Sequence, residues 1–263
     1  MQTPDLLIRV AVGVAISIVV SLVARRLRAL TRSGAIASTV VGAVAIAAGW
    51  SWGVLLFSLF ISVTALSAFR SAEKSKRLGS LLEKGSERDA AQIVANGAVF
   101  TIAAIGSLMS PGHGWHAIAA GALSFSAADT WATEIGTLAQ SDPRSLVTGR
   151  TVPAGTSGGV SVFGTLGGVA GALFVGVEAV FAAWPVSLAA VVLGGVLAGL
   201  ADSIVGATLQ AKRFCPHCSK PTERAVHDCG TVTTIAGGIS WLDNDAVNAL
   251  CSAIGALIVL VLQ

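Results

Sequence analysis

Long apolar stretches recur along the whole chain of 263 residues, and they limit most strongly what it can fold into. Each is close to the roughly 20 residues that a helix needs to cross a bilayer. Only 12% of the residues are charged, against about 25% in ordinary soluble domains, which excludes a soluble enzyme. The pattern predicts an all-α, polytopic helical membrane protein that forms a single integral membrane domain over residues 1–263. About eight transmembrane helices are expected, near residues 6–24, 34–49, 52–69, 91–110, 117–138, 158–183, 186–209 and 237–262.

The basic residues are distributed very unevenly between the ends of these segments. With the first loop, which begins at Arg25, in the cytoplasm, eight spans place every lysine and arginine except Arg9 on the cytoplasmic side. This asymmetry follows the positive-inside rule, and tryptophans prefer membrane interfaces. We therefore predict a multi-pass protein of the cell (cytoplasmic) membrane, with both termini outside and a site that faces the cytoplasm. The tryptophans expected at the outer interface are Trp50, Trp52, Trp115 and Trp184.

Two aspartates lie inside predicted spans, Asp129 in the fifth and Asp202 in the seventh. Ionisable residues within a membrane are costly and usually face a partner or a functional cavity. Both spans run in the same direction, so the two carboxylates are expected at matching depth, roughly 12–14 Å from the cytoplasmic ends. The alternative is that each merely binds a neighbouring helix. Glu134 lies about 140° around the helix from Asp129. It therefore either contacts the residues that bind the ligand, without touching the ligand itself, or lies where the helix unwinds.

The predicted eighth span opens with a polar cluster, Asp243, Asn244, Asp245 and Asn248. Some of these residues could cap the helix, because Asp and Asn are preferred N-caps. Four polar groups in six residues exceed what a cap requires. We expect Asn96, near the cytoplasmic start of the fourth span, to join them.

The two acid-bearing spans also suggest an internal repeat. Asp129 is followed by a loop and then Gly158-Gly159, and Asp202 by a loop and then Gly237-Gly238. Repeated membrane folds often place a binding site between their halves. The repeat therefore predicts one cleft that receives a carboxylate and a glycine-rich helix start from each half.

The segment between Arg150 and Gly159 resembles a phosphate-binding loop. Glycines permit a close backbone approach, and the first N–H groups of the following helix are unpaired and partly positive. The alternative is a plain loop before a helix, but Arg144 and Arg150 favour an anion site. The loop residues expected to bind phosphate are Pro153, Gly155, Thr156, Ser157, Gly158 and Gly159.

Three cysteines cluster in the last predicted cytoplasmic loop, residues 210–236. Together with one histidine they provide four ligands, the number that a closed structural zinc site uses. Cytoplasmic thiols stay reduced, which favours a metal over a disulfide. We predict a zinc-knuckle-like loop, with His217 as an alternative to His227. The expected ligands are Cys215, Cys218, His227 and Cys229.

These motifs together resemble the membrane family of plant phytyl-phosphate kinases and their bacterial, archaeal and animal relatives. The matching segments are 126–136, 152–161, 201–210 and 242–248, with 87–97 also similar. The resemblance covers roughly residues 34–262, and a more distant one links the chain to CTP-using polyprenol kinases and CDP-diacylglycerol synthases. It implies phosphoryl transfer from CTP, with ATP as the second choice, to an isoprenoid monophosphate in the presence of Mg²⁺.

The resemblance and the residues together suggest a role for each group. Asp129 and Asp202 are expected to bind Mg²⁺, with Asp243 or Asp245 as a further ligand. Arg150 and the 153–159 loop would cradle the triphosphate with help from Arg88 or Arg144. The residues expected to orient phosphates or water, or to support the site, are Asn96, Glu134, Asn244 and Asn248. The expected partners are a nucleoside triphosphate, a prenyl-phosphate lipid and the bilayer, without nucleic acid, and a homodimer is left open.

Three other functions fit parts of the pattern. An ion-coupled transporter of an anionic solute would use paired carboxylates at mid-membrane. A cytidylyltransferase would form a CDP-lipid and release pyrophosphate. A scaffold would dock partners through the zinc loop and tolerate the loss of Asp129.

Overall fold

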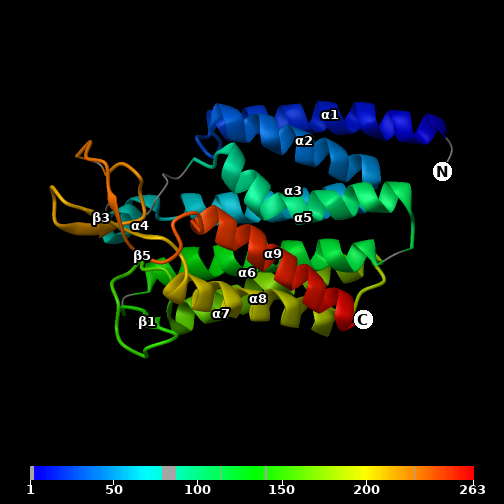
Figure 1. The fold of residues 1–263 in the computed structure, drawn as a ribbon. Helices are drawn as coiled ribbons and strands as arrows, with labels where there is room; N and C mark the ends of the chain where they lie inside the picture. Colours follow the sequence, from blue (N-terminus) through cyan, green and yellow to red (C-terminus); the bar gives the residue numbers. More distant parts are fainter. Residues whose placement is uncertain (1–2, 79–86, 113, 140, 228) are drawn as a thin grey trace.

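Long helices that run along a common direction dominate the computed structural model, which describes residues 3–78, 87–112, 114–139, 141–227 and 229–263 (Figure 1). A short helix, α4, covers Ser71–Leu78. The long helices in this described part of the chain are α1 (Thr3–Arg26), α2 (Arg32–Ala48), α3 (Trp50–Ala68), α5 (Ala90–Met109), α6 (Trp115–Leu138), α7 (Val162–Phe181), α8 (Leu188–Thr208) and α9 (Asn244–Val261).

These eight helices correspond one to one with the eight predicted spans. Six of them, α1, α3, α5, α7, α8 and α9, are long and apolar enough to cross a membrane. Helix α2 is apolar but has only 17 residues, and α6 has 24 residues but is not among the helices that are apolar enough by composition alone. The prediction of a helical membrane protein is confirmed, with six clear spans and one shorter apolar helix.

Helix α6 lies among other helices of the bundle. It packs against α3, α5, α7, α8 and α9, and most of its buried residues are alanines. Four glycines of α7 lie directly on the backbone of α6, so a side chain at Gly167 or Gly171 would collide with carbonyl oxygens of Trp131 or Ala127. Small residues allow such close approach where lipid provides no hydrophobic drive for association.

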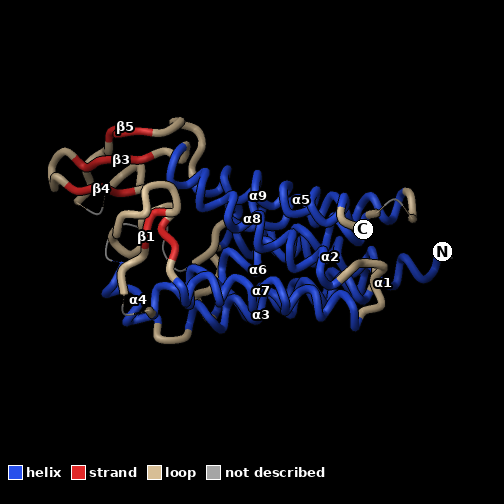
Figure 2. The backbone as a smooth tube through the Cα atoms, turned by 90° about the horizontal axis from the view of Figure 1, so that it is seen from below, coloured by secondary structure: helices blue, strands red, loops and turns tan. Residues whose placement is uncertain are grey.

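The structure adds short strands at one end of the helices, where the sequence predicted only loops (Figure 2). Strands β1 (Arg144–Ser145) and β2 (Gly159–Val160) form an antiparallel pair. The segment that carries the cysteines forms a three-stranded antiparallel sheet in the order β4-β3-β5, with β3 at Lys212–Cys215, β4 at Lys220–Thr222 and β5 at Thr234–Gly237. The strands explain why α7 and α9 begin several residues after the predicted span starts.

The two ends of the bundle differ in what they carry. The connections after α1, α3, α6 and α8 lie together at one end, and both chain termini lie at the other (Figure 1). Trp50 is exposed at the terminal end, but Trp52 and Trp184 are buried with their rings 4.9 Å apart. These two indoles therefore fill the core between α3 and the α7–α8 turn instead of facing an interface.

Candidate functional site

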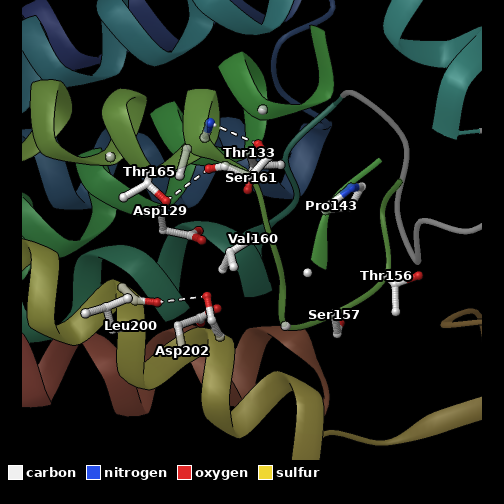
Figure 3. Close-up of a pocket in the computed structure, with 18 of the residues that line it drawn as sticks. Asp129, Thr133, Pro143, Thr156, Ser157, Val160, Ser161, Thr165, Leu200 and Asp202 are labelled. Carbon is white, nitrogen blue, oxygen red and sulfur yellow. Dashed lines mark hydrogen bonds between the residues drawn. The ribbon is translucent and has the colours of Figure 1, made fainter. Parts of the chain in front are cut away.

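A polar cavity of about 230 Å³ opens between α6, α7 and α8, beside the segment that includes β2. Asp129 of α6 and Asp202 of α8 both line it (Figure 3). The structure thus brings together the two carboxylates that the sequence singled out. Their placement on separate helices around one space is what a shared cation or ligand site requires.

The two aspartates lie within electrostatic reach of each other. Asp129 is nine residues from the last residue of α6, and Asp202 is six residues from the last residue of α8. At 1.5 Å per residue these depths are about 14 Å and 9 Å from the loop end of the bundle. No hydrogen bond or ion pair to another described side chain satisfies either carboxylate, so mutual repulsion makes a shared cation favourable.

The glycine-rich loop forms the other wall of this cavity. Residues 154–161 line it, and the N-cap of α7, Ser161, accepts a hydrogen bond from the Gly164 N–H at 3.1 Å. Gly158 has a left-handed backbone (φ 76°) and lies against the backbone of α8 at Ser203 and Ala207. The N-terminus of α7 therefore faces the cavity, as the phosphate-loop prediction requires.

Three members of the predicted loop site lie outside the cavity lining. Pro153, Arg144 and Arg150 are exposed, and the Arg144 guanidinium donates to the Gly149 carbonyl at 3.2 Å. The described structure does not place either arginine against the aspartates.

Glu223 is a cavity residue that sequence reasoning missed. It follows β4 in the cysteine-bearing segment, and its Oε1 accepts hydrogen bonds from Ser157 Oγ and from Gln210 Nε2, the latter at 3.4 Å. Burial raises the pKa of Glu223, and the Ser157 hydrogen bond opposes part of this effect. No spacing in the sequence marks this glutamate, because only the folding of the sheet brings it to the cavity.

The charged part of the cavity lining is acidic. Its charged lining residues are Asp129, Asp202 and Glu223, and none of the described lining residues is a lysine or an arginine. Such a lining favours a divalent cation. The three acids do not form a compact protein-only cage, which fits Mg²⁺, since Mg²⁺ usually keeps waters and binds one or two carboxylates plus substrate phosphates.

The polar start of α9 divides between several roles. Asn244 lines the cavity. Asp243 is exposed and is the N-cap, accepting a hydrogen bond from the Ala246 N–H at 2.9 Å. Asp245 and Asn248 do not line the cavity, and Asn248 is buried in the helix packing. Helix capping, the alternative considered for this cluster, therefore accounts for Asp243.

Glu134 points to a different part of the molecule from Asp129. Its carboxylate forms an ion pair with Lys74 of α4 at 2.6 Å and accepts a hydrogen bond from Ser67 of α3. Arg88 and Asn96 line a second cavity, between α1, α2, α3, α5 and α6. These three residues are therefore not brought together with the paired aspartates.

The four predicted zinc ligands do meet. One ligand atom from each of Cys215, Cys218, His227 and Cys229 lies within 4.8 Å of all the others. Cys215 Sγ and Cys229 Sγ are 3.6 Å apart, close to the roughly 3.8 Å expected around a tetrahedral zinc with Zn–S bonds of about 2.3 Å. Hydrogen bonding with Thr231 and then His227 lowers the pKa of Cys229 to about 5, whereas hydrogen bonding to Cys229 raises the pKa of Cys218 to about 11. Without a metal, Cys229 is therefore the thiolate of this pair. The cluster fits a metal ion.

Fold and cavity together define a polytopic helical membrane protein with a carboxylate-bearing site near one end of its bundle. The chain belongs to the integral membrane protein family DUF92, whose model matches residues 15–256. This membership agrees with the resemblance that the motifs indicated.

Three relatives illustrate the similarity. The chain is 28% identical over 242 residues to an uncharacterized membrane protein of Methanocaldococcus jannaschii, covering 90% of this chain and 95% of that protein. It is 27% identical over 269 residues to Protein PGR of Arabidopsis thaliana, covering 91% of each. It is 28% identical over 137 residues to the chloroplastic Protein VTE6 of Arabidopsis thaliana, covering 51% of this chain and 34% of that protein. No solved structure matches the chain.

Proposed function

We propose that the protein is an isoprenoid-monophosphate kinase that uses MgCTP, with MgATP as the alternative donor, and forms the prenyl diphosphate. The observation that carries this proposal is that Asp129 and Asp202 line the same cavity as a glycine-rich loop and the N-terminus of a helix. Carboxylates paired with a phosphate-binding backbone suit a metal–nucleotide complex. The motif resemblance to phytyl-phosphate kinases supports the same reaction.

Asp129 and Asp202 are the residues that would hold Mg²⁺, with Glu223 as a further candidate in place of Asp243, which caps α9. When bound, Mg²⁺ neutralises charge on the transferring phosphoryl group and holds the donor in place. The chain's own contribution is to keep three acidic side chains in one partly enclosed space, so that a free triphosphate is repelled and its metal complex is accepted.

In the reaction, an oxygen of the lipid phosphate attacks the terminal phosphorus of the nucleotide. The new P–O bond forms as the bond to the bridging oxygen breaks, and CDP leaves with that electron pair. A phosphate monoester has a second pKa near 6, so it is largely dianionic at pH 7 and needs no strong base. The protein must mainly position two anions in line.

The loop 154–161 would bind the triphosphate through backbone N–H groups at the start of α7. Arg144 and Arg150 are exposed at the same end of the bundle, so we assign them a role in attracting the anionic nucleotide to the cavity. Asn244, which lines the cavity, would orient a phosphate or a water molecule. The prenyl chain would lie between helices within the bilayer.

The substitution Asp129→Asn tests the proposal most directly. Purified protein in detergent is incubated with radiolabelled CTP or ATP, Mg²⁺ and geranylgeranyl phosphate or phytyl phosphate, and labelled diphosphate is counted. Because loss of a residue that supports a metal site already costs about 10–100-fold, loss of a ligand should reduce product formation by at least that factor. The matched control is Glu178→Gln, which removes a carboxylate of α7 that binds Ser58 at 2.8 Å outside the cavity.

Absence of diphosphate from wild-type protein with both nucleotides, beside an active plant relative, would refute the kinase assignment. Pyrophosphate release with a CDP-lipid product would indicate a cytidylyltransferase instead. The charged residues that line the cavity are all acidic, which also suits an ion-coupled transporter; that function predicts cation-dependent solute flux in liposomes without any nucleotide requirement.

A further inference from the structure

A second cavity, of about 110 Å³, lies between α1, α2, α3, α5 and α6. This space is large enough for several water molecules, and it suits a small headgroup and the first atoms of a chain. Most of its lining is apolar, from residues such as Val41, Leu56, Leu59, Phe60 and Leu123.

Polar side chains contribute the rest of its lining. Arg88 precedes α5, Gln92 and Asn96 lie on successive turns of α5, and Ser126 and Thr130 lie one turn apart on α6. Ser126 Oγ donates to Asn96 Oδ1 at 3.3 Å, which joins the two helices beside the cavity. The cavity is therefore amphipathic, with an arginine among otherwise neutral side chains.

The backbone of Arg88 is fixed in place. Its N–H donates to the Ala29 carbonyl at 2.9 Å, and its carbonyl accepts from the Thr31 N–H at 3.0 Å, on either side of the buried Leu30. Gly34 at the start of α2 lies so close that any side chain there would collide with the Arg88 carbonyl. These contacts fix the backbone of Arg88 beside the cavity.

The guanidinium of Arg88 has far fewer partners than donors. An arginine has five N–H donors, and in the described part of the chain the hydrogen bond of this side chain is a long one, 3.4 Å to Ser67 Oγ. The acid that influences it electrostatically is Glu134, which already pairs with Lys74 at 2.6 Å. Among the described side chains, none forms an ion pair with Arg88, so an anion that enters the cavity can bind it.

We propose that this second cavity binds the anionic headgroup of a single-chain lipid phosphate, with Arg88 as its counter-ion and the chain packed along α2 and α3. A phosphate ester offers acceptor oxygens to the N–H donors of Arg88. Charge-assisted hydrogen bonds of this kind are stronger than those between neutral groups. The apolar lining accepts the first carbons of the chain. The ligand comes either from the pool of prenyl phosphates or from the anionic lipids of the surrounding membrane.

The second cavity is separate from the paired aspartates. Asp129 faces the first cavity and its neighbour Thr130 faces the second, because adjacent helical residues point about 100° apart. Binding at Arg88 therefore does not depend on the kinase proposal, and each can fail without the other.

Binding of dodecyl phosphate to the full-length protein in dodecyl maltoside tests the inference. Affinity is followed by native mass spectrometry and by the ligand-dependent rise in unfolding temperature. Wild type should bind dodecyl phosphate and should bind dodecanol or dodecyltrimethylammonium far more weakly. Arg88→Gln should weaken phosphate binding about 10–100-fold, since a hydrogen bond to a charged group contributes about that factor. The control is Arg26→Gln, which replaces an exposed arginine in the last turn of α1. This variant should bind dodecyl phosphate as the wild type does.

Gly97→Ala gives a second, independent test in case Arg88→Gln does not fold. Gly97 lines the cavity, and a β-carbon there would make only ordinary contact with Val41, at 3.6 Å. The variant should therefore fold and bind dodecyl phosphate more weakly, while Gly237→Ala, where a β-carbon meets open space, should not change binding. Equal binding by wild type, Arg88→Gln and Gly97→Ala, or equal binding of dodecanol and dodecyl phosphate, would overturn the proposal.

Competition identifies the source of the ligand. Displacement by geranylgeranyl phosphate but not by lysophosphatidic acid points to the prenyl pool, and the reverse points to membrane lipid. Asp129→Asn should retain dodecyl phosphate binding in either case, and its loss there would contradict two separate sites.

Discussion

Two glycines of the loop between α6 and α7, Gly149 and Gly158, share a left-handed backbone, with φ values of 66° and 76°. Their surroundings differ. Nothing lies near a side chain added at Gly149, whereas one at Gly158 would collide with the backbone of α8 at Ser203 and Ala207. The close approach at Gly158 seats the loop on α8 beside Asp202.

This contrast predicts different costs for the same substitution. Gly149→Ala should lower the stability by about 1 kcal/mol, the cost of an unfavourable φ. Gly158→Ala adds a backbone collision, so it should cost about 2–4 kcal/mol and also weaken nucleotide binding. Thermal unfolding of the two variants in one detergent measures the difference, and equal losses would contradict the packing described here.

Single residues also show where sequence reasoning reached the site. Asp129 and Asp202 could be identified because a carboxylate inside an apolar helix is rare and needs a cause. Glu223 could not, because a glutamate in a polar loop is ordinary and only the β3–β4 hairpin directs it to the cavity. Arg88 was assigned to the nucleotide, but its neighbours in space place it at a different cavity.

At the scale of elements, an ion pair between Lys74 and Glu134 connects the short helix α4 to α6. Lys74 is almost fully buried, and besides Glu134 of α6 it donates to the Leu66 carbonyl at the end of α3. Removing one member of a buried pair leaves the other charge without compensation.

Lys74→Met should therefore destabilise the protein by about 3 kcal/mol. The double variant Lys74→Met with Glu134→Gln should recover part of this loss, because neither member of the ion pair is then left charged without the other, while Arg88 loses its neighbouring carboxylate. Arg70→Met is the matched control, since Arg70 and Glu73 form an exposed pair and such pairs contribute less than about 1 kcal/mol. Unfolding temperatures of the four proteins check the prediction, and a loss for Lys74→Met no larger than that for Arg70→Met would count against it.

The cysteine-bearing sheet is the second element, and its stability is expected to depend on a bound metal ion. Cys215 ends β3, and Glu223 directly follows β4, which pairs with β3. A metal on the four ligands would therefore stabilise the hairpin that holds Glu223 against Ser157 and Gln210.

We expect purified protein to contain about one zinc ion per chain. Removal by a strong chelator, or the substitution Cys218→Ser, should speed trypsin cleavage after Lys212, Arg213 and Arg224 and reduce activity, because the hairpin loosens. Cys251→Ala, in the packed part of α9 away from the cluster, should retain zinc. Metal analysis and limited proteolysis make the measurement, and a metal-free protein with an equally resistant loop would show that the cluster binds no zinc.

At the scale of the whole molecule, the bundle has one end with loops and strands and an opposite end with both termini (Figure 1). The first is the charged end, because the connections after α1, α3, α6 and α8 carry most of the lysines and arginines of the sequence. The positive-inside rule then predicts which end faces the cytoplasm. Both cavities have their polar residues toward the charged end, so this orientation also decides from which side nucleotide and headgroups arrive.

Reporter fusions test the orientation in bacterial cells. Alkaline phosphatase fused after Gln263 should be active, since it folds only outside the cytoplasm, and green fluorescent protein at the same position should be dark. Insertion of the two reporters after Lys220 should give the opposite pattern. A bright green fluorescent protein at the C-terminus would reverse the assigned orientation.

The sequence by itself determined the helices, because apolar length is a local property and a bilayer requires each backbone group to be satisfied within its own segment. It also determined the four candidate metal ligands and the two membrane carboxylates, because rare residue types in unusual contexts can be recognised without knowing their partners. Tertiary structure alone decided which residues share a cavity. It separated Arg88, Asn96 and Glu134 from Asp129 and added Glu223, because neighbours in space depend on how helices rotate and pack, and the spacing along the chain does not encode that.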